Sequence, residues 1–191
     1  MSERVHDSFQ LATFGGGCFW CLEAVFEQVA GVESVVSGYC GGHTIDPTYQ
    51  QVYAGTTGHA EVVRICFDPA EVAYEDLLKI FFTIHDPTTL NRQGNDVGTQ
   101  YRSVIFCHSA VQRETVASFM RSLGEAQYWH DPIVTEVLTD ATFYPAEDYH
   151  QHYFSKNPEQ GYCQMVVAPK LVKFRKIFSS KMKGTVRPDR A

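Results

Sequence analysis

Three consecutive glycines at positions 15–17 stand between a predicted strand and a predicted helix, and this junction constrains the fold more than any other feature. The apolar run at residues 9–14 is typical of a strand. After the glycines, apolar residues recur at helical spacing until Gly31, and these are Phe19, Leu22, Phe26 and Val29. The sequence therefore predicts a strand, a sharp turn and an amphipathic helix, with Cys18 where the helix begins.

The rest of the chain alternates between predicted strands and helices. Further strands are predicted at residues 32–39, 61–67, 103–108 and 133–138. Helices are predicted at 74–84, at 110–127 and from Pro145 to about residue 155, because proline favours the first helical position. Polar loops are predicted at 40–58 and 86–99, and the residues after Cys163 are apolar and strand-like. This order, without repeats or internal linkers, predicts a single α/β or α+β domain.

Charge and hydropathy exclude several classes of protein. The chain has 16 Lys+Arg against 22 Asp+Glu, and its net charge of −6 argues against a nucleic-acid partner. Its longest apolar runs fall far short of the roughly 20 residues that span a bilayer, and residues 1–10 lack the apolar stretch of a signal peptide. We therefore expect a soluble, cytoplasmic monomer with no membrane partner.

The 6 cysteines are expected to be mostly reduced thiols, because the sequence shows no export signal. Cys66 and Cys107 lie inside predicted strands, where a free cysteine usually behaves as a small hydrophobic residue.

Cys18 is the candidate nucleophile. Unpaired backbone N–H groups and the positive end of the helix dipole favour an anion at a helix N-terminus, so the position predicts a lowered thiol pKa. The alternative is a cysteine that merely packs ahead of the helix.

Cys18 and Cys21 together form a C-x-x-C motif, which in a reduced chain predicts a reversible disulfide or half of a metal site. Zinc needs about four ligands, and no second C-x-x-C motif follows. His150 and His152, two apart on a predicted helix, point in different directions and are expected at the surface or behind the site. Redox chemistry is therefore favoured over a metal.

Glu61 is the candidate acid. Strand alternation places it on the apolar face with Val63, Ile65 and Phe67, where desolvation raises a carboxyl pKa and keeps a general acid protonated. Alternatively, Glu61 stands at the strand start and simply reaches solvent. The flanking polar loops carry Tyr49 in one and residues 91–101 in the other, and tyrosine hydroxyls there are able to stabilise an oxyanion.

An ordered set of short segments is similar to peptide methionine sulfoxide reductase A. The segments are Gly-Cys-Phe-Trp at 17–20, Gly-Tyr-Cys-Gly-Gly at 38–42, Pro-Thr-Tyr at 47–49, Gly-His-Ala-Glu at 58–61, His-Asp-Pro at 85–87, Arg-Gln-Gly-Asn-Asp at 92–96, Gly-Thr-Gln-Tyr-Arg-Ser at 98–103, Phe-Tyr-Pro-Ala-Glu at 143–147 and Gly-Tyr-Cys at 161–163. They spread over nearly the whole chain. As an ordered set, they are a very specific signal.

The resemblance implies an α+β fold, in which a mixed sheet with a βαβ-type core is surrounded by helices. It also implies an oxidoreductase of protein repair under oxidative stress, which converts the S epimer of methionine sulfoxide, in proteins or free, to methionine. No bound cofactor is needed. On this basis we expect a flexible N-terminus at residues 1–8, a catalytic reductase domain at 9–178 and a basic C-terminal tail at 179–191.

Roles for individual residues also follow from the resemblance. Cys18 is implied to be the nucleophile that becomes a sulfenic acid, which a second thiol converts to a disulfide for reduction by thioredoxin. The other implied roles are an apolar wall for the S-methyl group at Phe19 and Trp20, an acid at Glu61, and a polar network around the sulfoxide oxygen at Tyr49, Tyr101 and Asp96.

The identity of the second thiol is open between Cys21 and Cys163. Cys163 matches the first tail cysteine of many family members, but the residues after it are apolar rather than the glycine-rich, flexible tail of those members. Cys21 lies one helical turn from Cys18, within the roughly 7 Å between Cα atoms that a disulfide requires. We therefore rank Cys21 ahead of Cys163, with Cys40 third.

Two other functions compete with this interpretation. A thioredoxin-like dithiol oxidoreductase would act on protein disulfides through the C-x-x-C motif alone, and would not need Glu61. A zinc module without catalytic activity would contain stoichiometric metal.

Overall fold

A six-stranded mixed sheet forms the centre of the computed structural model, which describes residues 9–139 and 141–184. Its strand order is β7-β6-β1-β3-β2-β8. The strands are β1 (Gln10–Gly16), β2 (Val32–Cys40), β3 (Ala60–Phe67), β6 (Ser103–Cys107), β7 (Glu136–Thr139) and β8 (Phe143–Pro145). Only the β6–β7 pair is parallel among these pairings, so the mixed α+β sheet is confirmed.

Strand register brings the start of β3 to the end of β1. The two strands are antiparallel, with Phe14 opposite Val63, so Glu61 lies just beyond the last paired residues of β1. The chain then turns at Gly17, whose φ of +97° favours glycine, and helix α1 (Phe19–Phe26) begins immediately. The sheet therefore places Cys18 beside Glu61, although the two are far apart in sequence.

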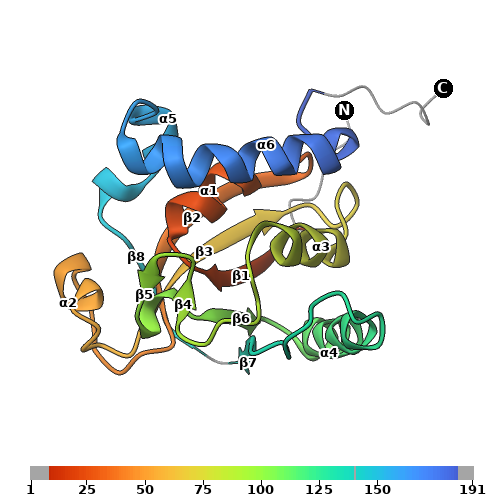
Figure 1. Ribbon diagram of the computed structural model, residues 1–191, viewed down its shortest axis with the longest axis horizontal. Helices are drawn as coiled ribbons and strands as arrows, with labels where there is room; N and C mark the ends of the chain where they lie inside the picture. The colour runs from red at the N-terminus through yellow and green to blue at the C-terminus, as the bar shows by residue number, and fades with distance from the viewer. Residues whose placement is uncertain (1–8, 140, 185–191) are drawn as a thin grey trace, which may run out of the picture.

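Helices cover the sheet and complete the core. Figure 1 shows α6 (Ala168–Ile177) lying alongside α1, and α6 also packs against α3 (Tyr74–Ile84). The α3 bounds agree with the sequence prediction. Helix α4 (Ala110–Glu125) packs against α3 and β6. Stacked aromatic rings pack the sheet against the helices. The ring centroids of Phe14 in β1 and Phe81 in α3 are 5.0 Å apart.

The helix predicted from Pro145 is wrong. Residues 143–145 form β8 on the edge of the sheet, where a proline costs little because its missing N–H faces away from the ladder. The helix predicted from Pro145 is replaced by the short 3₁₀ turn η2 (Asp148–His150) and by α5 (Tyr153–Lys156), separated by His152 at φ +55°.

The segment after Cys163 is helical, not strand-like. A π-helical turn, η3 (Cys163–Val167), runs directly into α6, because the apolar residues there cover α1 at helical spacing. The predicted loops also hold short elements, namely α2 (Tyr49–Tyr53) and a hairpin of β4 (Arg92–Gln93) and β5 (Asp96–Val97).

The described part of the predicted basic tail packs against the body of the protein. Met182 forms a β-bridge with Val29, and the Lys181 ammonium lies 2.7 Å from a carboxylate oxygen of Asp76. Residues 1–8, predicted as a flexible N-terminus, lie outside the described residues.

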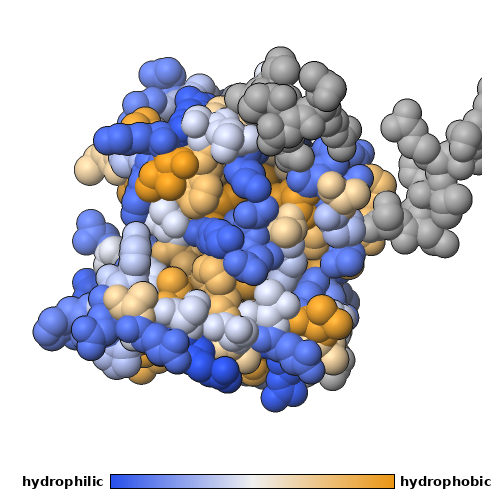
Figure 2. All heavy atoms as spheres, turned by 90° about the vertical axis from the view of Figure 1, so that its right-hand side faces the viewer, coloured by the Kyte–Doolittle hydropathy of each residue, from blue (hydrophilic) through white to orange (hydrophobic). Residues whose placement is uncertain are grey.

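The surface mixes polar and apolar residues. Figure 2 shows hydrophobic residues scattered between hydrophilic ones on the face that it presents. Within residues 9–139 and 141–184, no helix has the length and apolar character needed to cross a bilayer.

Candidate active site

A cavity of about 190 Å³ opens at the N-terminus of α1. Its lining residues come from the start of α1, from α2, β3 and β5, from the 3₁₀ turn after β5 and from the residue before η3. They are Cys18, Phe19, Trp20, Tyr49, Tyr53, Glu61, Asp96, Tyr101 and Tyr162. The structure thus brings together all the residues expected to carry the nucleophile, acid, wall and oxygen-binding roles. Cys21 and Cys163 lie outside the lining.

Glu61 is a buried carboxyl with a single backbone donor. Its side chain is only 2% exposed, and one carboxyl oxygen accepts a hydrogen bond from the Phe19 N–H at 3.1 Å. Burial raises the pKa of Glu61 to about 8, although the Phe19 N–H acts in the opposite direction. Near neutral pH this carboxyl is therefore protonated and able to donate a proton.

Cys18 occupies the N-cap position of α1 and is 8% exposed. Burial raises the pKa of its thiol well above the ordinary range; a hydrogen bond with the Cys21 thiol and the Glu61 charge add to this effect. The Trp20 N–H acts in the opposite direction but is outweighed. The expectation of a lowered pKa is therefore wrong, because desolvation of the thiol exceeds the effect of a short helix.

Tyrosine side chains make up a large part of the cavity lining. Tyr49 begins α2, which Thr48 caps through its side chain, and Tyr101 ends the 3₁₀ turn η1 (Thr99–Tyr101). Burial raises the pKa of Tyr49 to about 12 and raises that of Tyr101 further, so both hydroxyls remain donors. Tyr162 donates a hydrogen bond of 2.7 Å to Asp96.

Tyr53 and Tyr162 were not assigned roles from the sequence. Tyr162 belongs to the Gly-Tyr-Cys segment at 161–163, so the resemblance offered a signal for it. Tyr53 stands in the predicted loop, where nothing distinguishes it from a solvent-facing residue.

The apolar wall of the cavity is an aromatic stack. The ring centroids of Trp20 and Tyr153 are 3.7 Å apart, with an angle of 6° between the ring planes. The Tyr162 ring packs edge-on against Trp20, with the centroids 5.8 Å apart. Phe19 is 1% exposed and contacts Tyr39 and His150 from behind. Both expected wall residues therefore have fixed orientations.

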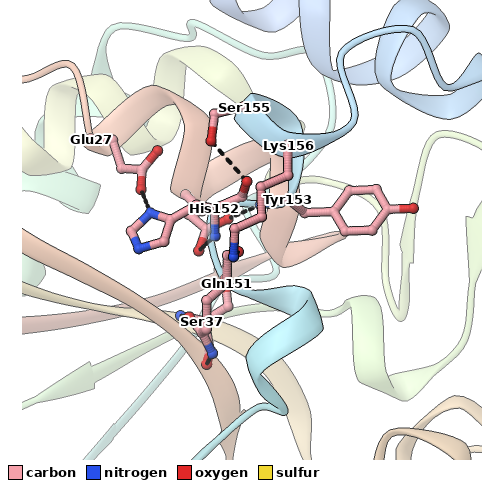
Figure 3. Close-up of polar contacts among 8 residues, drawn as sticks. Glu27, Ser37, Gln151, His152, Tyr153, Ser155 and Lys156 are labelled. Atoms are coloured by element: carbon pink, nitrogen blue, oxygen red, sulfur yellow. Dashed lines mark hydrogen bonds and ion pairs between the residues drawn. The ribbon is translucent and has the colours of Figure 1, made fainter.

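The segment that carries His150 and Tyr153 is attached to both β2 and α1. The Gln151 side chain pairs with the N–H and C=O of Ser37, each at 2.9 Å, and the His152 imidazole contacts the Glu27 carboxylate (Figure 3). Glu23, buried in α1, accepts hydrogen bonds from the N–H groups of His152 and Tyr153. These contacts hold the Tyr153 ring against Trp20.

Glu147 joins the same segment to the Tyr49 loop. One carboxylate oxygen accepts from the Tyr49 N–H and the other from the Tyr39 hydroxyl, each at 2.8 Å. Although burial acts to raise it, these donors hold the pKa of Glu147 below its ordinary value. An ionised Glu147 therefore fixes the loop that presents Tyr49.

Cys21 lies one helical turn after Cys18 and is fully buried. A hydrogen bond with the Cys18 thiol lowers the pKa of Cys21 and, together with the positive charge of Lys170, overcomes the opposite effect of burial. Cys163 is also buried, in η3 against α1, and burial followed by the Cys21 charge raises its pKa. Cys40 lies in a separate core cluster with Val62 and Phe106.

Comparisons with known proteins agree on one family. The family model described as "Peptide methionine sulfoxide reductase" matches residues 10–182. "Peptide methionine sulfoxide reductase MsrA" of Polynucleobacter asymbioticus is 57% identical over 173 residues, which cover 91% of each chain.

Solved structures show the same likeness. Mxr1 from Saccharomyces cerevisiae in reduced form has a TM-score of 0.74 at 32% identity, covering 85% of this chain and 95% of that one. Methionine sulfoxide reductase A of Corynebacterium diphtheriae has a TM-score of 0.72 at 36% identity, with 86% and 82% covered. Mxr1 has also been solved in complex with Trx2; that structure has a TM-score of 0.54 at 24% identity, covers 80% of this chain and 92% of that one, and shows the fold alone.

Proposed function

Because the chain belongs to the peptide methionine sulfoxide reductase A family and reduces methionine sulfoxide to methionine, we propose that Cys18 and Glu61 carry out the chemical step. The observation that supports this most directly is the hydrogen bond between Glu61 and the Phe19 N–H, which holds the acid beside the nucleophile in one cavity. The polar network and the aromatic stack then hold the two ends of the sulfoxide group.

The first step transfers oxygen from the substrate to Cys18. Glu61 donates its proton to the sulfoxide oxygen, which makes the substrate sulfur electrophilic, and Tyr49 and Tyr101 donate hydrogen bonds to the same oxygen. The Cys18 sulfur attacks the substrate sulfur while its thiol proton passes to Glu61. This attack forms an S–S bond between the two sulfurs. The S–S bond and the substrate S–O bond then break as the hydroxyl group is transferred to the Cys18 sulfur, so methionine leaves, Cys18 carries a new S–O bond as a sulfenic acid, and Glu61 is again protonated.

The Trp20 ring provides the surface for the S-methyl group. With the oxygen held on the polar side and the methyl group on the aromatic side, one configuration at sulfur fits better than its mirror image, and the likeness to the family implies that this is the S epimer. The defining experiment is an assay of the two separated epimers with dithiothreitol as reductant. Turnover of the S epimer alone supports the proposal, whereas equal turnover of both contradicts it.

Replacing Trp20 by alanine is expected to raise KM by about tenfold with a smaller change in kcat, because it removes apolar contact with the substrate methyl group but no reacting atom. The chain has 2 tryptophans, so Trp129→Phe leaves Trp20 as the single tryptophan whose fluorescence reports substrate binding. Trp129→Ala is the matched control, since this ring packs against Phe82 away from the cavity. A normal KM for Trp20→Ala would contradict the proposed role of Trp20 in binding the S-methyl group.

The second thiol is proposed to be Cys21. Its sulfur attacks the Cys18 sulfenic acid, an S–S bond forms, the S–O bond breaks, and the hydroxide leaves as water with the Cys21 thiol proton. The fixed helical position of Cys163 argues against a long movement towards Cys18.

Stoichiometric turnover without reductant tests this pairing. We expect peptide mapping to find Cys18 joined to Cys21, and Cys21→Ser to leave a sulfenic acid that dimedone labels. Cys163→Ser should form the disulfide at the normal rate. A disulfide between Cys18 and Cys163 in the unmodified protein would contradict the assignment.

The external reductant is proposed to be thioredoxin, and the compartment the cytoplasm. Yeast Mxr1 has been crystallised with Trx2, and the described cysteines of this chain are all free thiols. A dithiol oxidoreductase that acts on protein disulfides is not favoured, because it gives no role to Glu61.

A further inference from the structure

Four aromatic rings run from the cavity to the surface, each in contact with the next. Tyr53 packs against Tyr49 with the ring centroids 5.9 Å apart, because the two residues lie on one face of α2. The His150 centroid lies 4.4 Å from that of Tyr49 and 4.2 Å from that of Tyr149. Tyr49 and Tyr53 line the cavity, whereas Tyr149 lies outside its lining. We call these four residues the aromatic strip.

The two ends of the aromatic strip are exposed. Tyr53 is 62% exposed and Tyr149 is 57% exposed, whereas His150 between them is 2% exposed. Tyrosine is enriched where proteins bind partners, because its rigid ring gives a large contact area for a small loss of conformational entropy. The strip therefore offers contact area, next to the cavity, that the described residues of the chain leave uncovered.

Hydrogen bonds fix the backbone that carries the strip. The Tyr49 N–H donates to the Glu147 carboxylate at 2.8 Å, and Glu147 immediately precedes η2, so α2 and η2 are joined. At the other end of α2, the Gln100 amide donates to the Tyr53 carbonyl at 2.9 Å. Because the rings are already in place, little ordering of the protein opposes the binding of a partner.

The size of the cavity indicates which partner the strip fits. Its volume of about 190 Å³ is below the roughly 300–1,000 Å³ of pockets that take up a whole small molecule. From a polypeptide substrate, only the oxidised methionine side chain enters such a space. The residues on either side of that methionine then lie against the surface around the cavity, which includes the exposed ends of the strip.

We propose that the aromatic strip binds an extended segment of the substrate polypeptide, and that Tyr53 and Tyr149 contact apolar side chains two residues away from the oxidised methionine. The proposal rests on the function proposed above, because it requires the sulfoxide to occupy the cavity. Peptides with apolar residues at that spacing are then better substrates than methionine sulfoxide without flanking residues.

The spacing follows from the geometry of an extended chain. Successive side chains point to opposite faces, so residues two apart point the same way and lie about 7 Å from each other. When the methionine side chain points into the cavity, its immediate neighbours point away from the protein. Tyr49 lines the cavity between the two ends of the strip, and the ring-to-ring steps of 5.9, 4.4 and 4.2 Å bring both ends within reach of side chains at this spacing.

Two pentapeptides of equal composition test this spacing. The first has the sequence Leu-Ser-Met-Ser-Leu and the second Ser-Leu-Met-Leu-Ser; both have blocked ends and carry the methionine as its S-sulfoxide. With dithiothreitol as reductant, we expect kcat/KM for the first to exceed that for the second by about tenfold, because burying one leucine side chain has an effect of this order. The blocked S-sulfoxide of methionine alone measures turnover without flanking residues.

Tyr149→Ser is expected to lower kcat/KM for the first pentapeptide by about fivefold and to leave the single-residue substrate unchanged, because this ring lies outside the cavity lining. Tyr149→Phe keeps the ring and should keep the full rate. Tyr53→Ser should reduce turnover of the first pentapeptide more than that of the single residue. Tyr128→Ser is the matched control, since Tyr128 is 67% exposed but packs against Trp129, away from the cavity.

Equal kcat/KM for the two pentapeptides, or a Tyr149→Ser variant with the preference of the unmodified enzyme, would overturn the proposal. A loss seen only when thioredoxin replaces dithiothreitol would assign the strip to the reductant instead. A dimer that Tyr149→Ser dissociates, without a change in peptide turnover, would assign it to a second copy of the chain. Failure of the proposed function is distinct from all of these, because the single-residue substrate would then give no methionine in the first turnover.

Discussion

Replacing Cys18 by serine is expected to abolish methionine formation, in multiple turnovers and in the first one. A serine hydroxyl cannot take up oxygen to form the sulfenic acid, and among the described residues no other thiol lines the cavity. The measurement is chromatographic detection of methionine after incubation of the variant with the S epimer and dithiothreitol.

Cys66→Ser is the matched control for this loss. Cys66 lies near the far end of β3, opposite Leu11 of β1, and is not among the residues that line the cavity. It should keep normal turnover. Residual methionine formation by Cys18→Ser that disappears when Cys21 is also replaced would transfer the nucleophilic role to Cys21.

Replacing Glu61 by glutamine is expected to lower kcat/KM by about 10²–10³-fold, the usual contribution of a general acid. Glutamine keeps an oxygen for the Phe19 N–H but has no acidic proton. In the unmodified enzyme the rate should fall as pH rises through about 8, because the acid is then lost. Glu61→Gln should lack this decline, and kcat/KM measured between pH 6 and 10 would detect the difference.

The same substitution has a predicted effect on stability. The folded-state pKa of Glu61 is raised from 4.5 to about 8, so folding takes up a proton between these values and stability is lost as pH rises through about 8. Glu61→Gln should therefore raise the melting temperature more at pH 9 than at pH 4. An equal change at both values would mean that the carboxyl is ionised in the folded protein near neutral pH.

The local sequence pattern predicted the elements that carry the site, but it did not predict that these elements lie next to one another in the fold. Alternation in β3 placed Glu61 on the apolar face, where the structure has it 2% exposed, and the glycine turn placed Cys18 at a helix start. The contact between them depends on the register of β1 with β3, which is a pairing of distant residues. The spacing of residues within β1 or within β3 alone cannot predict which residues of the two strands pair.

The misplaced elements have identifiable causes. An apolar run such as Met165–Val167 fits a strand or a buried helix equally well until its neighbour is known, and here the neighbour is α1. Pro145 fits the first turn of a helix or the edge of a sheet, and β2 had a free edge for it. The thiol pKa of Cys18 depends on burial by segments that lie far from it in sequence.

A thiol kept neutral in the resting state has a consequence for the durability of this enzyme. Hydrogen peroxide reacts with thiolates far faster than with thiols, and each such encounter risks overoxidation to an irreversible sulfinic acid. In the mechanism proposed above, burial keeps the Cys18 proton in place until the sulfoxide accepts the proton of Glu61, so ionisation of Cys18 would coincide with the arrival of substrate. This order of events would shorten the time during which Cys18 meets oxidants as a thiolate.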